Sequence, residues 1–484
     1  MKIWLCFGCK YRRLPIMVKA SFWFLFASFF QKGISVLTTP VFTRLLSTEE
    51  YGQYTVFNSW LDVFSVIIVL KMYAGVFSSS IVKYEPDKER YTASVQGLTA
   101  TLVLIWLFIY TLKKDRINEI LSLSTIQVYA MLGIIWTTAV FSFWAVEQRV
   151  DQKYRLLVIV TIIISILKPV TGILAVCVAE DKVTARIVTI ALVQMVVYAG
   201  FFFRDIYIGK TFFDKRYWEY TLLFCIPLLP HYISVTIMNS SDRIMIQQMA
   251  GESEAGIYGL AYSIAMLMIL LNDALLQTME PWIFKKIKTN CMEVIEETIF
   301  IALTMIAVIN IIFILVSPEI MRVFAPSTYW EGRWIIPPVA MSQYFQFLYS
   351  TFALFQFYYE KNFLIAAISS IGAILNVGLN YIFIPKLGYV AAGYTTLFSI
   401  AVYAVVHYFT MQRICMKEYG TRVFSIKHTM IHMMMFLGTG VAAAMTYYSI
   451  ALRWGMIVTI ICAIFVYRKK LLELVKTLMR AREG

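Results

Sequence analysis

Long apolar runs alternate with short polar segments along the whole chain. Each run is roughly twenty residues long, the length at which an α-helix crosses the hydrocarbon core of a bilayer. A helix satisfies its own backbone hydrogen bonds, which is what a segment surrounded by lipid requires. The runs predict about fourteen membrane-spanning helices and no β-strands, over residues 20–42, 58–80, 92–112, 125–146, 156–178, 186–203, 217–239, 257–280, 298–317, 334–358, 362–384, 388–411, 428–449 and 451–467.

Composition agrees with a polytopic membrane protein. Of the 484 residues, 60% are hydrophobic and only 15% are charged, and the mean hydropathy is +0.71. These values exceed what the core of a water-soluble domain needs. The segment Met1–Lys19 is basic, and the first run continues through Thr39 and Pro40 without a small-residue cleavage pattern. We therefore expect the first span to remain in the protein rather than to be removed as a signal peptide.

The distribution of basic residues predicts the orientation. When the amino terminus is placed inside, most of the 43 Lys and Arg residues fall in inside segments, as cytoplasmic loops require. Both termini are therefore expected in the cytoplasm. The formal net charge of +14 follows largely from this bias and from attraction to anionic lipid, so it does not indicate nucleic-acid binding.

A short phrase occurs twice, half a protein apart. Glu50–Tyr54 follows Arg44 after the first span, and Glu254–Tyr258 follows Arg243 after the seventh. An internal echo in a polytopic chain is typical of transporters built from two related bundles. We expect two pseudo-symmetric six-helix lobes around a central cavity, at 20–205 and 217–411. A cytoplasmic tail (1–19), a linker (206–216), and two further helices with a basic tail (412–484) complete the expected organisation.

Three lysines lie deep within predicted spans: Lys32, Lys71 and Lys168. An ammonium group in the middle of a lipid-facing helix costs a few kcal/mol, so such residues usually face a bundle interior or water. Snorkelling to the membrane surface, or a purely structural ion pair, is the alternative for each. Lys168 precedes Pro169, which is compatible either with a broken helix that lines a transport site or with a simple kink.

Helical spacing gives the first two lysines different surroundings. Ser28, Lys32, Ser35 and Thr39 share one helix face, which predicts that this stripe lines the cavity. In the second span, nine residues separate Asp62 from Lys71, which puts the two on opposite helix faces, so each needs a different partner. Lys71 then shares its face with Gly75 and Ser78, a row that would also suit close packing of another helix.

The sequence contains no nucleotide-binding motif that could supply energy for transport. Gly209-Lys210-Thr211 lacks the upstream glycine of a phosphate-binding loop, so we expect no ATPase within this chain. An ion gradient is the remaining source. Asp62, Asp273 and Glu280 are the candidate carboxylates for proton or sodium binding, although an ion pair with a lysine would explain each equally well.

The repeated phrase also carries a family resemblance. Thr43–Tyr54, Ser241–Ile246, Ala255–Tyr258 and Gly388–Gly393 resemble the polysaccharide flippases, a branch of the exporter superfamily that also holds MATE drug antiporters and the lipid II flippase. The resemblance implies movement of an undecaprenyl-diphosphate-linked oligosaccharide (an O-antigen or capsule repeat unit) to the outer leaflet by alternating access. It implies membrane lipid, a polysaccharide polymerase and chain-length proteins as partners, and no cofactor or catalytic residue.

The motif residues have a physical role beside the familial one. Gly52 and Gly256 would permit tight reversals of the chain, and Tyr54 and Tyr258 suit a membrane interface. Arg44 and Arg243 could tie these loops to a carboxylate or a carbonyl, with Glu50 in the same segment. We expect the motif to be architectural rather than substrate-binding.

Other functional classes make different demands on the sequence. A MATE-like drug antiporter would favour an acidic cavity for cationic drugs, whereas the deep charges here are mostly basic, and a lipid II-type flippase is a closer alternative. A membrane glycosyltransferase would need a catalytic constellation on a sizeable outer loop, and the outer loops are short. His428 and His432 lie one helical turn apart without further ligands, so no metal site is expected.

Overall fold

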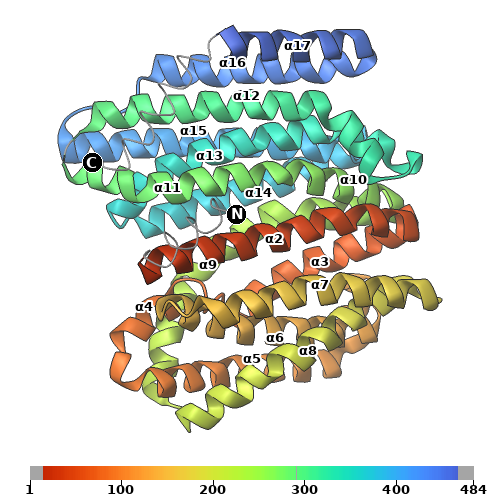
Figure 1. The fold of residues 1–484 in the computed structure, drawn as a ribbon, viewed down its shortest axis with the longest axis vertical. Coiled ribbons are helices and arrows are strands. Elements are labelled where there is room, and N and C mark those ends of the chain that lie inside the picture. The colour runs from red at the N-terminus through yellow and green to blue at the C-terminus, as the bar shows by residue number, and fades with distance from the viewer. Residues whose placement is uncertain (1–14, 290, 467–484) are drawn as a thin grey trace, which may run out of the picture. The chain divides into compact units, whose positions relative to one another are not determined.

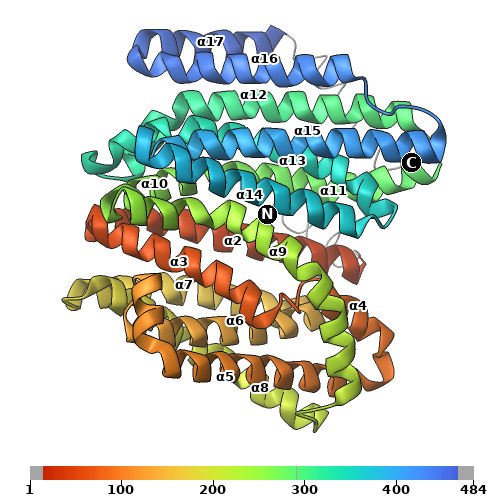
Figure 2. The same cartoon turned by 180° about the vertical axis from the view of Figure 1, so that it is seen from behind.

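The computed structural model describes residues 15–289 and 291–466, and all regular structure in those ranges is helical (Figures 1 and 2). The first half contains α2 (Ile16–Leu45), α3 (Thr48–Val69), α4 (Val76–Lys83), η1 (Glu85–Asp87), α5 (Lys88–Leu121), α6 (Thr125–Val150), α7 (Tyr154–Val178) and α8 (Lys182–Gly209). The second contains α9 (Lys215–Met249), α10 (Glu252–Ala265), η2 (Met266–Met268), α11 (Ile269–Lys288), α12 (Met292–Phe324), η3 (Ser327–Trp334), α13 (Ile336–Tyr358), α14 (Asn362–Leu387), α15 (Ala391–Tyr419), α16 (Ile426–Met445), η4 (Thr446–Tyr448) and α17 (Ile450–Val466).

Helical segments lie at all fourteen predicted spans. Within the described residues, eleven helical segments are long and apolar enough to cross a membrane. The prediction of an all-α polytopic membrane protein is therefore confirmed. The chain forms two compact units, Met1–Thr236 and Ile237–Gly484, and the division falls inside α9. The predicted linker, 206–216, contains the short connection between α8 and α9.

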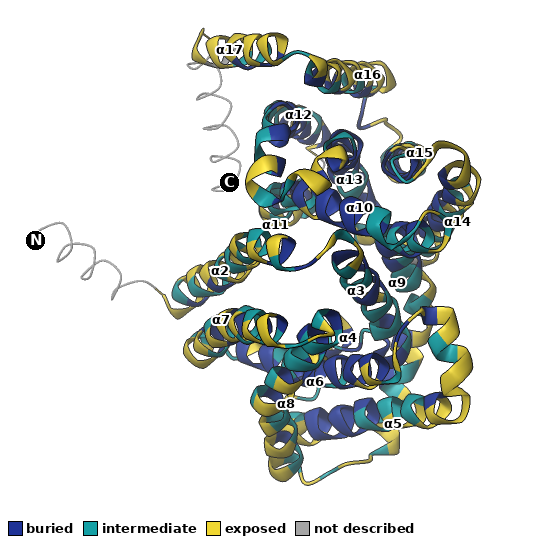
Figure 3. Cartoon of the chain, turned by 90° about the vertical axis from the view of Figure 1, so that its right-hand side faces the viewer, coloured by how far each residue is buried: buried dark blue, intermediate teal, exposed yellow. Residues whose placement is uncertain are grey.

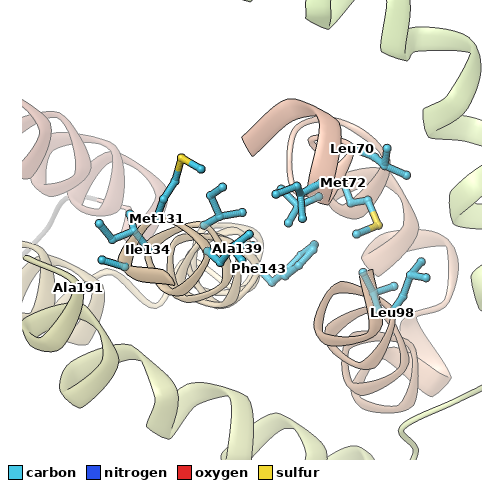
Figure 4. Close-up of a cluster of buried hydrophobic side chains, with 14 of the residues drawn as sticks. Leu70, Met72, Leu98, Met131, Ile134, Ala139, Phe143 and Ala191 are labelled. Atoms are coloured by element: carbon cyan, nitrogen blue, oxygen red, sulfur yellow. The ribbon is translucent and has the colours of Figure 1, made fainter. Parts of the chain in front are cut away.

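Unit 1 is organised around α6, which packs against α5 and α8. Its core is a cluster of buried apolar side chains from α5, α6, α8 and the segment after α3 (Figure 4). Phe143 and Met72 are completely buried in this cluster, and the Phe143 ring packs edge-on against Phe77 at 4.7 Å between centroids. Helices α2 and α7 pack on one another and leave many apolar side chains exposed (Figure 3). Such exposure is expected for a surface that faces lipid.

The second predicted span is not one helix. Helix α3 ends at Val69, and the chain adopts left-handed backbone conformations at Leu70 (φ 52°), Lys71 (φ 47°) and Gly75 (φ 113°) before α4 begins. The inference that Asp62 and Lys71 occupy opposite helix faces was wrong, as was the shared face of Lys71 with Gly75 and Ser78. Left-handed conformations at two residues other than glycine have no sequence signal, which is why the break was missed.

The two motif glycines do not reverse the chain. Gly52 lies inside α3 and Gly256 inside α10, so the predicted role of both in tight reversals was wrong. The chain turns instead just before these helices, at Leu46–Ser47 and at Gly251, whose φ of 127° favours glycine. Ser47 and Glu50 form a capping box at the start of α3, in which each side chain bonds the other's backbone amide.

Unit 2 is organised around α13, which packs against α10, α11, α12 and α15. Nearly every side chain of α13 is buried, and Figure 3 colours the residues of the chain by this burial. Tyr344 and Phe345 are both completely buried, and the Tyr344 ring stacks on Phe436 of α16 at 4.0 Å between centroids. Helix α14 packs against α15, and α16 and α17 pack on α12.

Candidate functional site

A cavity of about 190 Å³ lies within unit 1, between α2, α3, α7 and α8. This volume is roughly ten times what one water molecule requires. The lining side chains of α2 follow helical spacing, at Gln31, Ser35, Thr38 and Phe42. The remaining lining residues are Ile34, Tyr54, Ile164, Ser165, Lys168, Pro169, Arg186 and Ile190. The cavity is therefore apolar on part of its wall, polar on another part, and carries two cationic side chains.

Arg186 of α8 is held between two aromatic rings. Its guanidinium carbon lies 3.5 Å from the ring centroid of Phe42 and 3.5 Å from that of Tyr54, on α2 and α3. The residue is only 9% exposed, and its Nε and Nη1 atoms make no hydrogen bond within the described residues. Stacking on aromatic faces stabilises a guanidinium, but unpaired buried N–H groups carry a large desolvation cost.

Lys168 of α7 reaches the same cavity. Its Nζ atom lies 6.0 Å from the ring centroid of Tyr198 on α8. The side chain is partly buried, and no ion pair or hydrogen bond of its ammonium group is found among the described residues. Of the residues predicted to bind substrate, Lys168 and Ser35 are the two that line this cavity.

The other predicted substrate residues lie elsewhere on unit 1. Ser28 and Lys32 are exposed on α2, and Thr39 is partly buried there and donates its hydroxyl to the carbonyl of Ser35. None of the three lines the cavity, because the inward stripe runs through Gln31, Ser35, Thr38 and Phe42. The predicted stripe and the observed one share only Ser35.

Lys71 lies in the break between α3 and α4. Its Nζ atom is 5.4 Å from the ring centroid of Tyr232 on α9, whose hydroxyl donates a hydrogen bond of 3.2 Å to the carbonyl of Ala74. The first part of α9 thus closes over the break, and the Asp62 carboxylate acts electrostatically on the lysine. Lys71 does not line the cavity that Lys168 reaches.

The three carboxylates predicted to couple transport to an ion are not deeply buried. Asp62 and Glu280 are exposed, and Asp273 is partly buried on α11. A different carboxylate, Asp242 on α9, is completely buried in unit 2. The prediction named this residue only as part of the family motif.

Asp242 is surrounded by neutral hydrogen-bond donors. The Tyr258 hydroxyl (2.6 Å) and the Thr396 hydroxyl (2.8 Å) donate to its Oδ2 atom, and the Asn380 amide (2.6 Å) donates to Oδ1. Thr395 donates to the carbonyl oxygen of Asn380, and Asn376 donates to Thr396. No basic side chain pairs with Asp242 in the described part of the chain. The carboxylate is thus buried within a cluster rich in oxygen atoms.

The motif residues have structural contacts. Arg44 donates to the carbonyl of Pro40 at 2.7 Å, and Glu50 lies 3.6 Å from the Lys182 ammonium group. Arg243 donates to the carbonyl of Asn239 and lies 4.6 Å from the Tyr262 ring centroid. Tyr54 stacks on Arg186, and Tyr258 is completely buried against Asp242.

Comparison with known proteins places this arrangement in a family. A family model described as "Polysaccharide biosynthesis protein" matches residues 17–287, more than half of the chain. The chain belongs to the polysaccharide biosynthesis protein family. A relative of this polysaccharide biosynthesis protein, "Lsg locus putative protein 1" of Haemophilus influenzae, is 23% identical over 373 residues, which cover 74% of this chain and 89% of the relative.

Solved structures with the same fold are membrane transporters. The lipid II flippase MurJ in an inward closed conformation aligns with a TM-score of 0.68 at 14% identity, over 93% of this polysaccharide biosynthesis protein and 99% of MurJ. An inward-facing multidrug resistance transporter of the MATE family aligns with a TM-score of 0.57 at 16% identity, over 81% and 96% of the two chains. This polysaccharide biosynthesis protein therefore shares its fold with MurJ and with the MATE transporter.

The two sites of this polysaccharide biosynthesis protein suit different chemistry. The cavity of unit 1 presents an ammonium and a guanidinium group without a neighbouring carboxylate, which suits an anion. The cluster around Asp242 offers a carboxylate with amide and hydroxyl oxygens, which suits a proton or a hard monovalent cation. Sequence reasoning missed Arg186 because its charge stands at the start of a span, where basic residues are common.

Proposed function

We propose that this protein translocates an undecaprenyl-diphosphate-linked oligosaccharide from the cytoplasmic to the outer leaflet by alternating access. Family membership carries the proposal, and the cationic cavity of unit 1 supports it. The protein acts in the bacterial inner membrane with both termini in the cytoplasm. It delivers the glycan to a polysaccharide polymerase and its chain-length proteins, and its contribution is transport without catalysis.

Charge compensation is the physical problem that such a substrate presents. A diphosphate carries about two negative charges and has to cross a region of low dielectric constant, where a bare charge is strongly disfavoured. Cationic side chains along the path of the substrate offset that cost. Lys168 lines the cavity of unit 1, and we propose the same role for Lys32 on α2 and Lys71 in the break after α3, which lie outside this cavity. The undecaprenyl tail remains in lipid, between helices, while the sugar headgroup crosses.

An ion gradient drives the cycle in this proposal. The carboxylate that its surroundings support best as the coupling group is Asp242, because it is buried and its donors are neutral. Asp62, Asp273 and Glu280 remain candidates for the same role. Binding and release of a proton or sodium ion at Asp242 would add or remove one charge among α9, α10, α14 and α15, the helices that supply its neighbours.

The fold also supports a second candidate, ion-coupled drug antiport, since a MATE transporter is among the structural relatives. The cavity argues against it, because two cationic side chains disfavour the cationic drugs that such transporters favour. A drug-efflux assay separates the two functions.

The deciding experiment is complementation of a translocase-null strain, followed by flipping in proteoliposomes. We expect glycan export in cells, and movement of the lipid-linked glycan in vesicles only while a gradient is present. Collapsing the proton and the sodium gradient separately identifies the ion. Failure of the purified protein to move any lipid-linked glycan, together with active drug efflux, would refute the proposal.

A further inference from the structure

Arg186 is a buried cation in the unit 1 cavity, and two of its three guanidinium nitrogens have no hydrogen-bond partner within the described residues. We propose that Arg186 and Lys168 form an anion subsite that binds a phosphate group of the lipid-linked substrate. The assignment rests on the proposed function and adds a residue and a binding geometry to it. Four observations support it: the aromatic sandwich, the unpaired N–H groups, the missing carboxylate and the cavity itself.

The aromatic sandwich determines where the guanidinium can bond. Phe42 and Tyr54 cover its two faces at 3.5 Å each, so hydrogen bonds can form only in the plane of the group. The rings also hold that plane fixed, which lowers the entropy lost when a ligand binds. Arg186 is thus a pre-positioned donor whose orientation comes from helices α2 and α3.

Two of the three guanidinium nitrogens of Arg186, Nε and Nη1, are buried without partners in the described part of the chain. Buried polar groups in folded proteins are almost always paired, and a site that leaves charged donors unpaired is a site that a ligand completes. A phosphate supplies several acceptor oxygens that match the donors of a guanidinium.

Carboxylates of the protein do not neutralise this cavity. Neither Lys168 nor Arg186 forms an ion pair within the described residues, and no acidic side chain lines the cavity. The hydroxyls of Thr38 and Ser165 do not compete, since they donate to helix carbonyls at 2.9 Å and 2.6 Å. The charged donors that face an anion in this cavity are therefore the fixed guanidinium and the flexible ammonium group.

A lipid diphosphate and an acidic sugar both present negatively charged oxygen atoms. Of these two groups, we assign the phosphate as the ligand of the subsite. Two cations facing one cavity suit a group that carries more than one charge, whereas a sugar carboxylate carries one. Inorganic diphosphate, undecaprenyl diphosphate and glucuronate, tested separately, distinguish these sources.

The test uses the full-length protein in nanodiscs and three variants. Arg186→Met removes the charge but leaves an apolar side chain between the two rings, and Arg186→Lys keeps the charge without the planar fork. Arg155→Met is the matched control, because Arg155 is exposed near the start of α7. The measurements are the melting temperature of the free protein and the dissociation constants for the three anions.

We expect both diphosphates to stabilise the wild type and Arg155→Met. Arg186→Met should bind them at least tenfold more weakly, since a charged hydrogen bond contributes a factor of that size. Without ligand, Arg186→Met should melt at the wild-type temperature or above it, because an uncompensated buried charge has been removed. Arg186→Lys should bind more weakly than the wild type by a smaller factor.

Wild-type diphosphate affinity in Arg186→Met would overturn the subsite. If Arg186→Met does not fold, wild-type affinity in Arg186→Lys would overturn it as well. Equal binding of glucuronate and inorganic diphosphate would overturn the assignment to phosphate. The proposed function can be refuted independently of the subsite. If the wild type binds diphosphate through Arg186 but moves no lipid-linked glycan, the subsite stands and the proposed function is refuted.

Discussion

Replacing Asp242 by Asn tests whether the buried carboxylate of unit 2 binds the coupling ion. The change keeps the shape of the side chain and removes its charge. Three donors face the carboxylate, from Tyr258, Thr396 and Asn380. An amide can accept from only one side, so at least one of these donors loses its acceptor in Asp242→Asn.

The structure sets the size of the stability effect. In Asp242→Asn, the side-chain oxygen of the new residue best accepts from the hydroxyls of Tyr258 and Thr396. Its NH₂ group then points toward the NH₂ group of Asn380. Asn380 cannot turn to accept, because its own oxygen already accepts from Thr395. One hydrogen bond to a charged acceptor is therefore lost, and the free energy of unfolding should fall by about 1.5–3 kcal/mol.

The assay compares melting temperatures in sodium chloride and in choline chloride. A cation bound at 100 times its dissociation constant stabilises the folded protein by about 2.7 kcal/mol, so a sodium site raises the melting temperature of the wild type in sodium chloride, whereas a proton site leaves it the same in both salts. Asp242→Asn should lose this response and its gradient-driven transport. Tyr258→Phe is the control, since it removes one donor and keeps the carboxylate, and it should retain the response at reduced stability. An unchanged sodium response in Asp242→Asn would refute the assignment of a sodium site.

Two further predictions concern the architecture of unit 1. Asp151, in the turn between α6 and α7, is partly buried, which acts to raise its pKa, but hydrogen bonds from Lys153 (2.8 Å) and Lys88 (2.9 Å) outweigh burial and hold that pKa below its usual range. A lowered pKa stabilises the folded state above the unfolded pKa of about 3.9 and loses that effect as the pH falls through the folded value. Asp151→Asn should therefore melt below the wild type at pH 7, and the difference should shrink as the pH falls below the unfolded pKa of about 3.9 and through the folded value; a difference that stays constant over this fall in pH contradicts the ion-pair explanation. In the same unit, Gly97→Ala should prevent stable folding, because its β-carbon would collide with a backbone carbonyl, whereas Gly33→Ala meets no atom within 4 Å; detergent-extracted yield and melting temperature check both, and equal stability of the two variants would contradict the packing described.

Most of the fold follows from the hydrophobic pattern. Apolar runs of spanning length place helices because the bilayer permits no unsatisfied backbone, and helical segments lie at all the predicted spans. The break after Val69 could not be predicted in this way. It depends on left-handed conformations at Leu70 and Lys71, where the tertiary packing of the buried Leu70 and Met72 outweighs local preference.

The candidate sites were less accessible to sequence reasoning. The spacing of Ser28, Lys32, Ser35 and Thr39 identified a polar face of α2, but helical periodicity alone cannot determine which neighbouring stripe faces inward. Contacts between side chains that lie far apart in the sequence left no pattern in the local sequence. Arg186 meets the rings of residues 42 and 54, and Asp242 meets side chains 138 and 154 positions away, so only the packed structure reveals these two sites.

Proteoliposome flipping by the triple variant Lys32→Ala, Lys71→Ala and Lys168→Ala tests the central proposal most directly. The assay follows transfer of an undecaprenyl-diphosphate-linked oligosaccharide across the bilayer, with the amount of folded protein matched to the wild type. We predict that transfer is abolished while the protein still folds and inserts. Wild-type transfer by the triple variant would contradict the role of these cations in carrying the diphosphate.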